Sequence, residues 1–246
     1  MRRAGWTRPL VAGALLVLAA QPALAQQMSI DFGADGSLAG RSVQLLVLIT
    51  LLSLVPGLAV MITCFPFIVT VLSILRQGIG LQQSPPNMLI VTLALFLTYF
   101  VMEPVFLQAW ADGVTPLTEG RIDVEQALPL ALAPFRVFMA GRIAPDTFEA
   151  LQSLREGMEA TSLSPDAPLS VLVPSFLLSE IERAFQIGFL IFMPFLIIDL
   201  VVAAVLMSMG MMMVPPAIVS LPFKLAFFAV ADGWTLISGA LVRSYF

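Results

Sequence analysis

Four long apolar runs, separated by short polar or Gly/Pro-rich segments, form the main pattern along this chain. The first run, residues 42–75, contains no charged side chain. As one helix it would measure about 50 Å, which exceeds a hydrocarbon core of about 30 Å. Because Pro56-Gly57 and Pro66 interrupt the run, we expect a membrane span near residues 43–64 and then a second, shorter apolar helix.

The other three runs differ in how they are interrupted. The second covers residues 88–110 and is broken by Glu103-Pro104. The third and fourth cover residues 187–209 and 225–242, and each carries a single carboxylate. Runs of this length are typical of membrane helices. The pattern therefore predicts an all-α integral membrane protein, with about four long apolar helices arranged as hairpins.

Residues 111–180 have a different character, because they hold ten of the sixteen acidic residues and only four of the twelve basic ones. Their apolar positions recur at helical spacing, which predicts a small helical segment outside the membrane with its acids on solvated faces. Glu180 and the Glu182-Arg183 pair then begin the next helix, where acids complement the positive end of the helix dipole.

The N-terminus has the features of a signal peptide. Arg2, Arg3 and Arg8 precede a short apolar stretch, and Ala23-Leu24-Ala25 is a small-x-small cleavage signal. We expect cleavage after Ala25; the alternative is an uncleaved first membrane helix.

The expected organisation follows from these segments. It comprises a signal peptide (1–25), a short exported tail (26–41), a first apolar hairpin (42–110), an acidic helical periplasmic segment (111–180) and a second apolar hairpin with a Met-rich linker (181–246).

Charge placement predicts an orientation in the membrane. The two short linkers after the odd-numbered runs carry Arg76 and Lys224 and no acid. The positive-inside rule then places these linkers on the cytoplasmic side and residues 111–180 outside.

Composition narrows the function. The chain is 59% hydrophobic and 11% charged, with a mean hydropathy of +0.97, so its surface must face lipid or other subunits. There is no basic patch with interleaved aromatics, which argues against nucleic-acid binding. Without histidine and with one cysteine, Cys64, the chain lacks the residues for common triads and for His- or Cys-ligated metals. We therefore expect no enzyme activity, no metal and no cofactor.

Asp199 is the first candidate functional residue, because a carboxylate at membrane depth costs about 2.5–3.5 kcal/mol and is rarely there without a role. Two roles are open for Asp199, a proton-relay acid or half of an ion pair. The ion pair is favoured, because a transporter usually has several polar groups at membrane depth. Lys224 and Arg183 are the nearest candidate partners in sequence, and Asp232 is the other carboxylate in an apolar run.

The linker after the third run is rich in methionine. Met211, Met212 and Met213 are consecutive and lie between Gly210 and a Pro-Pro pair, where a regular helix is improbable. Methionine side chains are unbranched and adapt to irregular gaps. The pattern favours a deformable hydrophobic seal, which would need several subunits to close; ordinary core packing is the alternative.

Blocks over residues 60–246 resemble the FliP family of type III secretion export-gate proteins. The resemblance lies in these stretches: Leu72-Ser73-Ile74-Leu75-Arg76-Gln77, Gln82-Gln83-Ser84-Pro85-Pro86-Asn87, Phe100-Val101-Met102-Glu103-Pro104, Ala184-Phe185-Gln186-Ile187-Gly188-Phe189, Pro194-Phe195-Leu196-Ile197-Ile198-Asp199, Ser220-Leu221-Pro222-Phe223-Lys224 and Asp232-Gly233-Trp234. The family usually has a Thr-Arg-like pair where this chain has Pro66-Phe67, so a basic residue is lost here.

The resemblance implies an all-helical subunit of the flagellar basal body at the inner membrane. Five copies would assemble with FliQ and FliR, alongside other export apparatus proteins, into a channel for unfolded flagellar subunits. Met209, Met211, Met212 and Met213 would form the channel gasket. Glu180, Arg183, Asp199, Lys224 and Asp232 would form subunit contacts or ion pairs. The rival function is an ion- or proton-coupled secondary transporter that uses Asp199 and Asp232.

Overall fold

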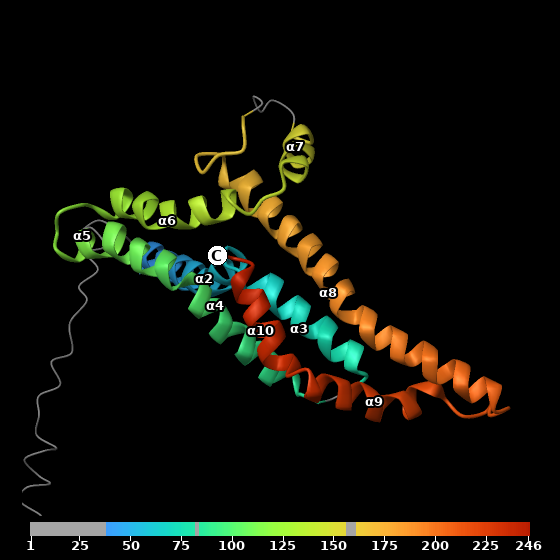
Figure 1. Cartoon of the computed structure of the whole chain (residues 1–246). Helices are drawn as coiled ribbons and strands as arrows, with labels where there is room; N and C mark the ends of the chain where they lie inside the picture. The colour runs from blue at the N-terminus through green and yellow to red at the C-terminus, as the bar shows by residue number, and fades with distance from the viewer. Residues whose placement is uncertain (1–37, 82–83, 156–160) are drawn as a thin grey trace, which may run out of the picture. The chain divides into compact units, whose positions relative to one another are not determined.

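The computed structural model describes residues 38–81, 84–155 and 161–246, and within these residues every regular element is a helix. The helices are α2 (Leu38–Met61), α3 (Phe65–Ile79), α4 (Asn87–Ala109), the π-helix η1 (Trp110–Val114), α5 (Thr115–Thr118), α6 (Val124–Ala140), α7 (Pro145–Ser153), α8 (Leu169–Ser208), α9 (Pro216–Val230) and α10 (Gly233–Arg243) (Figure 1). The prediction of an all-α fold is confirmed. The expected signal peptide and its cleavage site at Ala25 lie outside the described residues.

The chain divides into two compact units, residues 1–50 and 51–246. In the first unit the structure describes residues 38–50, which form the first part of α2. The second unit contains all the other helices and both hydrophobic cores.

Helix α3 is the centre of the larger core. Phe67, Val71 and Leu75 on its inner face are fully buried, and α3 packs mainly against α8 and also against α4. The helix begins with Pro66 in its first turn, where the missing N–H costs nothing. It ends at Gly80, whose φ of 89° gives the left-handed conformation that glycine adopts without strain.

Two expected helix breaks are wrong, because Pro56-Gly57 lies inside α2 and Pro104 lies inside α4. The expected break between a first span and a shorter apolar helix is confirmed, and it falls at residues 62–64, directly before α3. Apolar helices tolerate proline because neighbouring helices and small local adjustments satisfy the freed backbone groups.

Helix α8 is longer than the sequence predicted. It has 40 residues and begins at Leu169, not at Glu180, and it continues through Pro174 and Pro194. The stretches long and apolar enough to cross a membrane are Asn87–Thr118 and Leu169–Ser208. Two bent pairs, α6 with α7 (112°) and α9 with α10 (61°), would bring the number of spans to four if each pair is one span.

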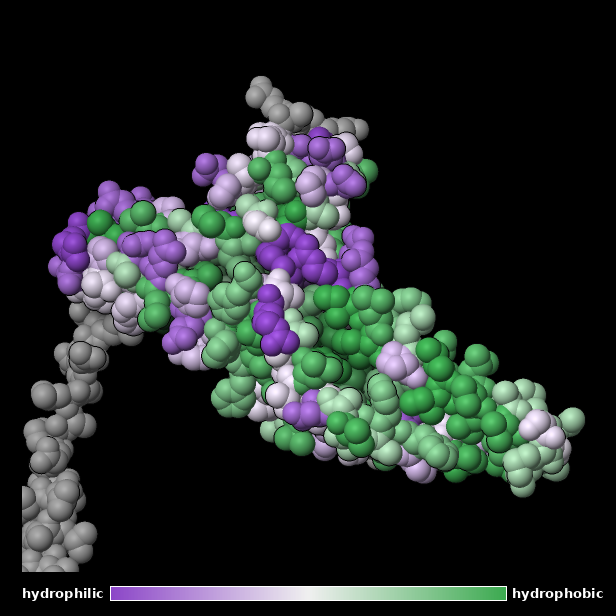
Figure 2. Space-filling model, viewed as in Figure 1, coloured by the Kyte–Doolittle hydropathy of each residue, from purple (hydrophilic) through white to green (hydrophobic). Residues whose placement is uncertain are grey.

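A smaller core lies where α6, α7 and the start of α8 meet. Met139, Phe148, Leu172 and Phe176 are buried there. This end of the second unit carries more hydrophilic surface than the long arm of α8 and α9, whose visible face is almost wholly apolar (Figure 2). The arm therefore needs lipid or protein against it.

The crossing of η1 and α6 depends on Gly113. A Cβ added there would lie 2.6 Å from the Cβ of Ala131 and 2.8 Å from its backbone nitrogen. We expect Gly113→Ala to push the helices apart and to lower the free energy of unfolding by about 1–3 kcal/mol, measured by denaturant unfolding in detergent. Gly57→Ala is the matched control, since nothing lies within 4 Å of its added Cβ. Equal stability of the two variants would contradict this packing.

Candidate functional site

The methionine-rich linker forms a short loop at the end of a helical hairpin. Helix α8 ends at Ser208, and α9 begins at Pro216. Gly210 adopts a φ of 77°, and the Met211 N–H donates to the Leu206 carbonyl at 3.0 Å. A left-handed glycine with this hydrogen bond is a common way to end a helix, so the backbone fixes where the loop leaves α8.

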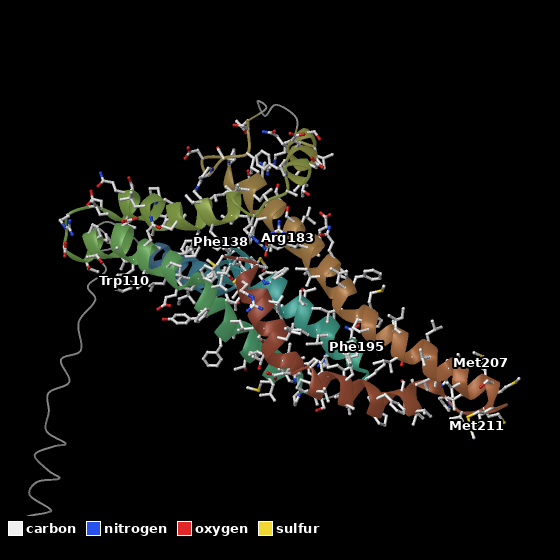
Figure 3. All side chains as sticks on the ribbon, viewed as in Figure 1. Trp110, Phe138, Arg183, Phe195, Met207 and Met211 are labelled. Carbon is white, nitrogen blue, oxygen red and sulfur yellow. The ribbon has the colours of Figure 1, made fainter. Side chains whose placement is uncertain are left out.

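The methionine side chains of the loop are not packed by the chain itself. The exposed fractions are 63% for Met209, 46% for Met211, 85% for Met212 and 97% for Met213. Met207 and Met211 mark this tip in Figure 3, at the far end of α8. A run of largely exposed thioethers is available to pack against something outside the chain.

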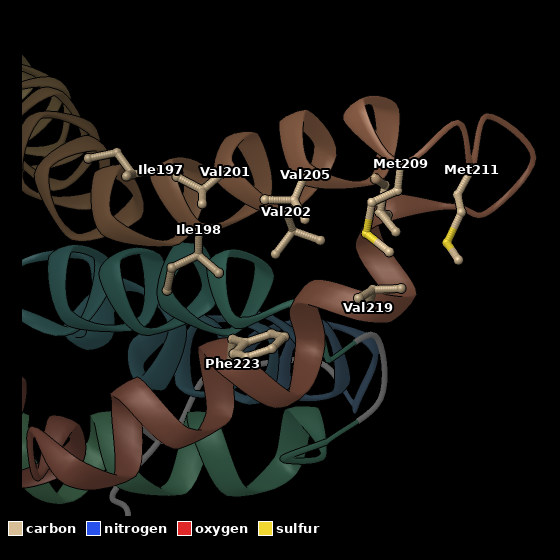
Figure 4. Close-up of a pocket in the computed structure, with 10 residues that line it drawn as sticks. Ile197, Ile198, Val201, Val202, Val205, Met209, Met211, Val219 and Phe223 are labelled. Atoms are coloured by element: carbon tan, nitrogen blue, oxygen red, sulfur yellow. The ribbon is translucent and has the colours of Figure 1, made fainter.

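An apolar cavity of about 540 Å³ lies directly below the loop. Met209 and Met211 form its outer wall, and side chains of α8 and α9 such as Val205 and Phe223 line the rest (Figure 4). This space leaves room beside the Met209 and Met211 side chains.

An ion pair joins α8 and α9 below the cavity. Lys224 Nζ donates to Asp199 Oδ2 at 2.6 Å, and Ser220 Oγ donates to Asp199 Oδ1 at 2.5 Å. Lys224 Nζ also donates to the Gly78 carbonyl at 3.2 Å. Lys224 is 6% exposed, whereas the Asp199 side chain is 37% exposed. One ammonium therefore ties α3, α8 and α9 together at the base of the methionine hairpin.

A second buried charge cluster surrounds Glu180, which is fully buried in the interior of α8. Its carboxylate accepts hydrogen bonds from Arg142 Nε at 3.0 Å, from Arg183 Nη1 at 3.4 Å and from the Tyr245 hydroxyl. The expectation that Glu180 begins a helix, where it would complement the dipole, and lies on a solvated face is wrong. Because α8 begins eleven residues earlier, at Leu169, Glu180 lies where α6, α8 and the C-terminus converge.

The C-terminal residues complete this cluster. Arg142 Nη1 donates to the Ser244 carbonyl at 2.9 Å, and its guanidinium lies 4.0 Å from the centre of the Tyr245 ring. The Tyr245 ring also stacks on Phe138. Burial, together with the negative charge of Glu180, raises the pKa of the Tyr245 hydroxyl well above its ordinary value. The phenol therefore stays a hydrogen-bond donor throughout the neutral and mildly alkaline range.

The structure thus brings together only some of the residues that the sequence singled out. Asp199 pairs with Lys224, while Arg183 pairs with Glu180 and not with Asp199. Asp232 is exposed at the start of α10, has a φ of 47° and accepts a hydrogen bond from Thr235.

The sequence pattern did not indicate Arg142 and Tyr245 as members of this charge cluster. Neither carries a local sequence signal, because their partners lie 38 and 65 residues away in the chain.

These features define a helical membrane protein in which the hairpin of α8 and α9 ends in an exposed methionine loop above a partly buried ion pair. The FliP family matches residues 48–241, and the chain belongs to that family.

Three relatives, each described as a flagellar biosynthetic protein FliP, illustrate the match. The chain is 44% identical to the protein of Caulobacter vibrioides over 100% of this chain and 92% of the relative. It is 45% identical to that of Agrobacterium fabrum (94% and 97% covered) and 43% identical to that of Bacillus subtilis (89% and 98% covered). The resemblance predicted from sequence is confirmed, and it makes this chain a membrane-associated flagellar biosynthetic protein.

We expect the ion pair to behave as one unit in a double-mutant cycle. Asp199→Leu leaves a buried ammonium with only a carbonyl partner, so it should cost about 3 kcal/mol of unfolding free energy. Lys224→Met should cost less, because Asp199 is partly exposed and keeps Ser220. The double variant should recover most of the loss. Additive losses in detergent unfolding would contradict this coupling.

Tyr245→Phe removes one donor from the buried Glu180 carboxylate and keeps the ring. We expect it to lower the unfolding free energy by about 1–2 kcal/mol, whereas deletion of Phe246, which is 80% exposed, should have little effect.

Because the pKa of Tyr245 is raised, the difference in unfolding free energy between wild type and Tyr245→Phe should depend on pH. The folded state holds the phenolic proton more tightly than the unfolded state, so stability from this group is fully present below pH about 10 and is lost as the pH rises further. The gap between wild type and Tyr245→Phe should therefore narrow only above that pH. A gap that is absent at pH 7 would contradict the proposed hydrogen bond.

Proposed function

We propose that this chain is a pore-forming subunit of the flagellar type III protein export apparatus. In this proposal it lies in the bacterial inner membrane at the flagellar basal body and conducts unfolded flagellar subunits. The methionine loop is the gasket that closes the channel. The observation that carries the proposal is the loop itself, with Met212 and Met213 almost fully exposed at the end of a well-anchored hairpin.

A gasket needs soft contacts on a fixed support. Methionine supplies the soft contact, because its thioether side chain re-packs around surfaces of varied shape. The fixed support is the hairpin of α8 and α9, which the Lys224–Asp199 pair ties to α3. The cavity beneath Met209 and Met211 gives these side chains room to retreat when a polypeptide passes.

One loop cannot close a channel, so the proposal includes several copies. We propose five, assembled with FliQ and FliR, and further export apparatus proteins, around one channel. The apolar surface of α8 supports assembly: Phe185, Phe189, Leu190 and Leu200 are each at least 60% exposed. Such a face must be covered by lipid or by a neighbouring subunit.

Orientation and domain organisation belong to the same proposal. Arg76 and Lys224 lie within α3 and α9 and not in linkers, which corrects the expectation from sequence. In this proposal the chain end that carries these two basic residues faces the cytoplasm, and residues 111–180 form a periplasmic segment between two apolar hairpins, residues 42–110 and 181–246.

The chain acts without catalysis of its own, and energy comes from its partners. Ion-coupled transport through Asp199 is the less favoured function, because Lys224 and Ser220 already occupy the two carboxylate oxygens.

We expect replacement of Met211, Met212 and Met213 by glycine to make the membrane permeable to small solutes, because the seal loses its apolar side chains. Solute release or dye entry in cells that contain the assembled apparatus measures this effect. The control replaces Met88, an 80% exposed methionine at the start of α4, and should leave permeability unchanged. A triple variant that assembles normally and stays impermeable would refute the gasket.

A further inference from the structure

Helix α4 has two faces of similar apolarity but opposite burial. Ile90, Ala94, Val101 and Met102 face the core and are almost fully buried. The opposite face is aromatic and exposed. Its residues, with their exposed fractions, are Phe96 (70%), Tyr99 (60%), Phe100 (60%) and Leu107 (64%), and Trp110 (62%) continues this face at the start of η1.

A single carboxylate, Glu103, lies in the middle of this exposed face. At 3.6 residues per turn, Tyr99 and Phe100 lie one turn before it and Leu107 one turn after it. Glu103 is exposed, and among the described residues it takes part in no hydrogen bond or ion pair. We refer to Glu103 and the five exposed residues around it as the α4 stripe.

The position of the α4 stripe makes an unpaired carboxylate unfavourable. Helix α4 is the main part of Asn87–Thr118, a stretch long and apolar enough to cross a membrane. Carboxylates at such depth usually pair with a cation on another helix, because hydrocarbon cannot solvate them. Among the side chains that the structure describes, none forms an ion pair with Glu103.

We propose that the α4 stripe is the docking surface for an apolar helix of a different membrane subunit, which places one basic side chain against Glu103. Charge complementarity identifies the chemistry of the partner, and the aromatic surroundings favour arginine. A guanidinium can pair with a carboxylate and stack on aromatic rings at the same time.

Among the basic side chains that the structure describes, those within α3, α8 and α9 already have partners in the chain, which argues against a second copy as the source of the cation. Arg76, Arg183 and Lys224 bond to Asn87, Glu180 and Asp199 respectively. Arg243 is exposed in the last turn of α10, at the end of the bent pair of α9 and α10.

This inference deepens the proposed function and rests on it only in treating the chain as one subunit of a larger membrane complex. It does not depend on the methionine loop. If Met211–Met213 variants stay impermeable while Glu103 variants lose their partner, the docking surface stands and the gasket fails.

The test uses the full chain in cells that make the whole apparatus. The complex is extracted in mild detergent through a tag on this chain, and its mass and subunit content are measured. We expect Glu103→Gln to reduce the mixed complex about tenfold or more, and Glu103→Arg to reduce it further. Glu125→Gln, which removes an exposed acid on α6, is the control and should have no effect. The unfolding free energy of the isolated chain should be unchanged in all three, because these side chains are exposed.

Suppressor mutations of Glu103→Arg identify the subunit whose basic side chain pairs with Glu103. Cells with Glu103→Arg should regain motility through a basic-to-acidic change in an apolar helix of a different subunit. Repair by a basic-to-acidic change in this chain, such as Arg41→Glu or Arg243→Glu, would place the cation on a second copy and overturn the inference. Complexes of wild-type mass with both Glu103 variants would overturn it as well.

Discussion

The ammonium of Lys224 constrains the whole second hairpin. It is almost fully buried and reaches Asp199 on α8 and the Gly78 carbonyl at the end of α3. An uncompensated ammonium in this apolar setting would be strongly destabilising, so the three helices must keep their relative positions. The methionine loop projects from the far end of the same hairpin, and its place is therefore set by one charge pair. The Glu180 cluster has the same effect at the opposite end of α8, where it fixes α6 and the C-terminus.

Folding of one chain leaves a large part of its apolar surface uncovered. Two cores are complete, one around α3 and one around Phe148 and Phe176. The outer faces of α4 and α8 remain exposed and are as apolar as the inner ones. Lipid or protein must cover this remaining surface, which is consistent with a membrane-associated member of a family of flagellar biosynthetic proteins.

Composition and length of the apolar runs were sufficient to predict the helical membrane fold, and the blocks from Leu72 onward were sufficient for the family. The helix ends were harder to predict, because Pro104 and Pro174 are accommodated inside helices once neighbouring helices pack against them. The ion pair of Asp199 had a signal, since a lone acid in an apolar helix demands a partner. Tyr245 and Arg142 had none, because their pairing with Glu180 arises only from the tertiary fold.

The convergence of methionine loops from several copies is the central claim, and a disulfide between copies tests it most directly. Met212→Cys in a Cys64→Ser background places a single thiol at an 85% exposed tip. If the loops meet around one channel, mild oxidation of the assembled complex in membranes should link copies into dimers, whereas Leu154→Cys at the end of α7 should not. An assembled complex in which Cys at position 212 stays unlinked would contradict the account.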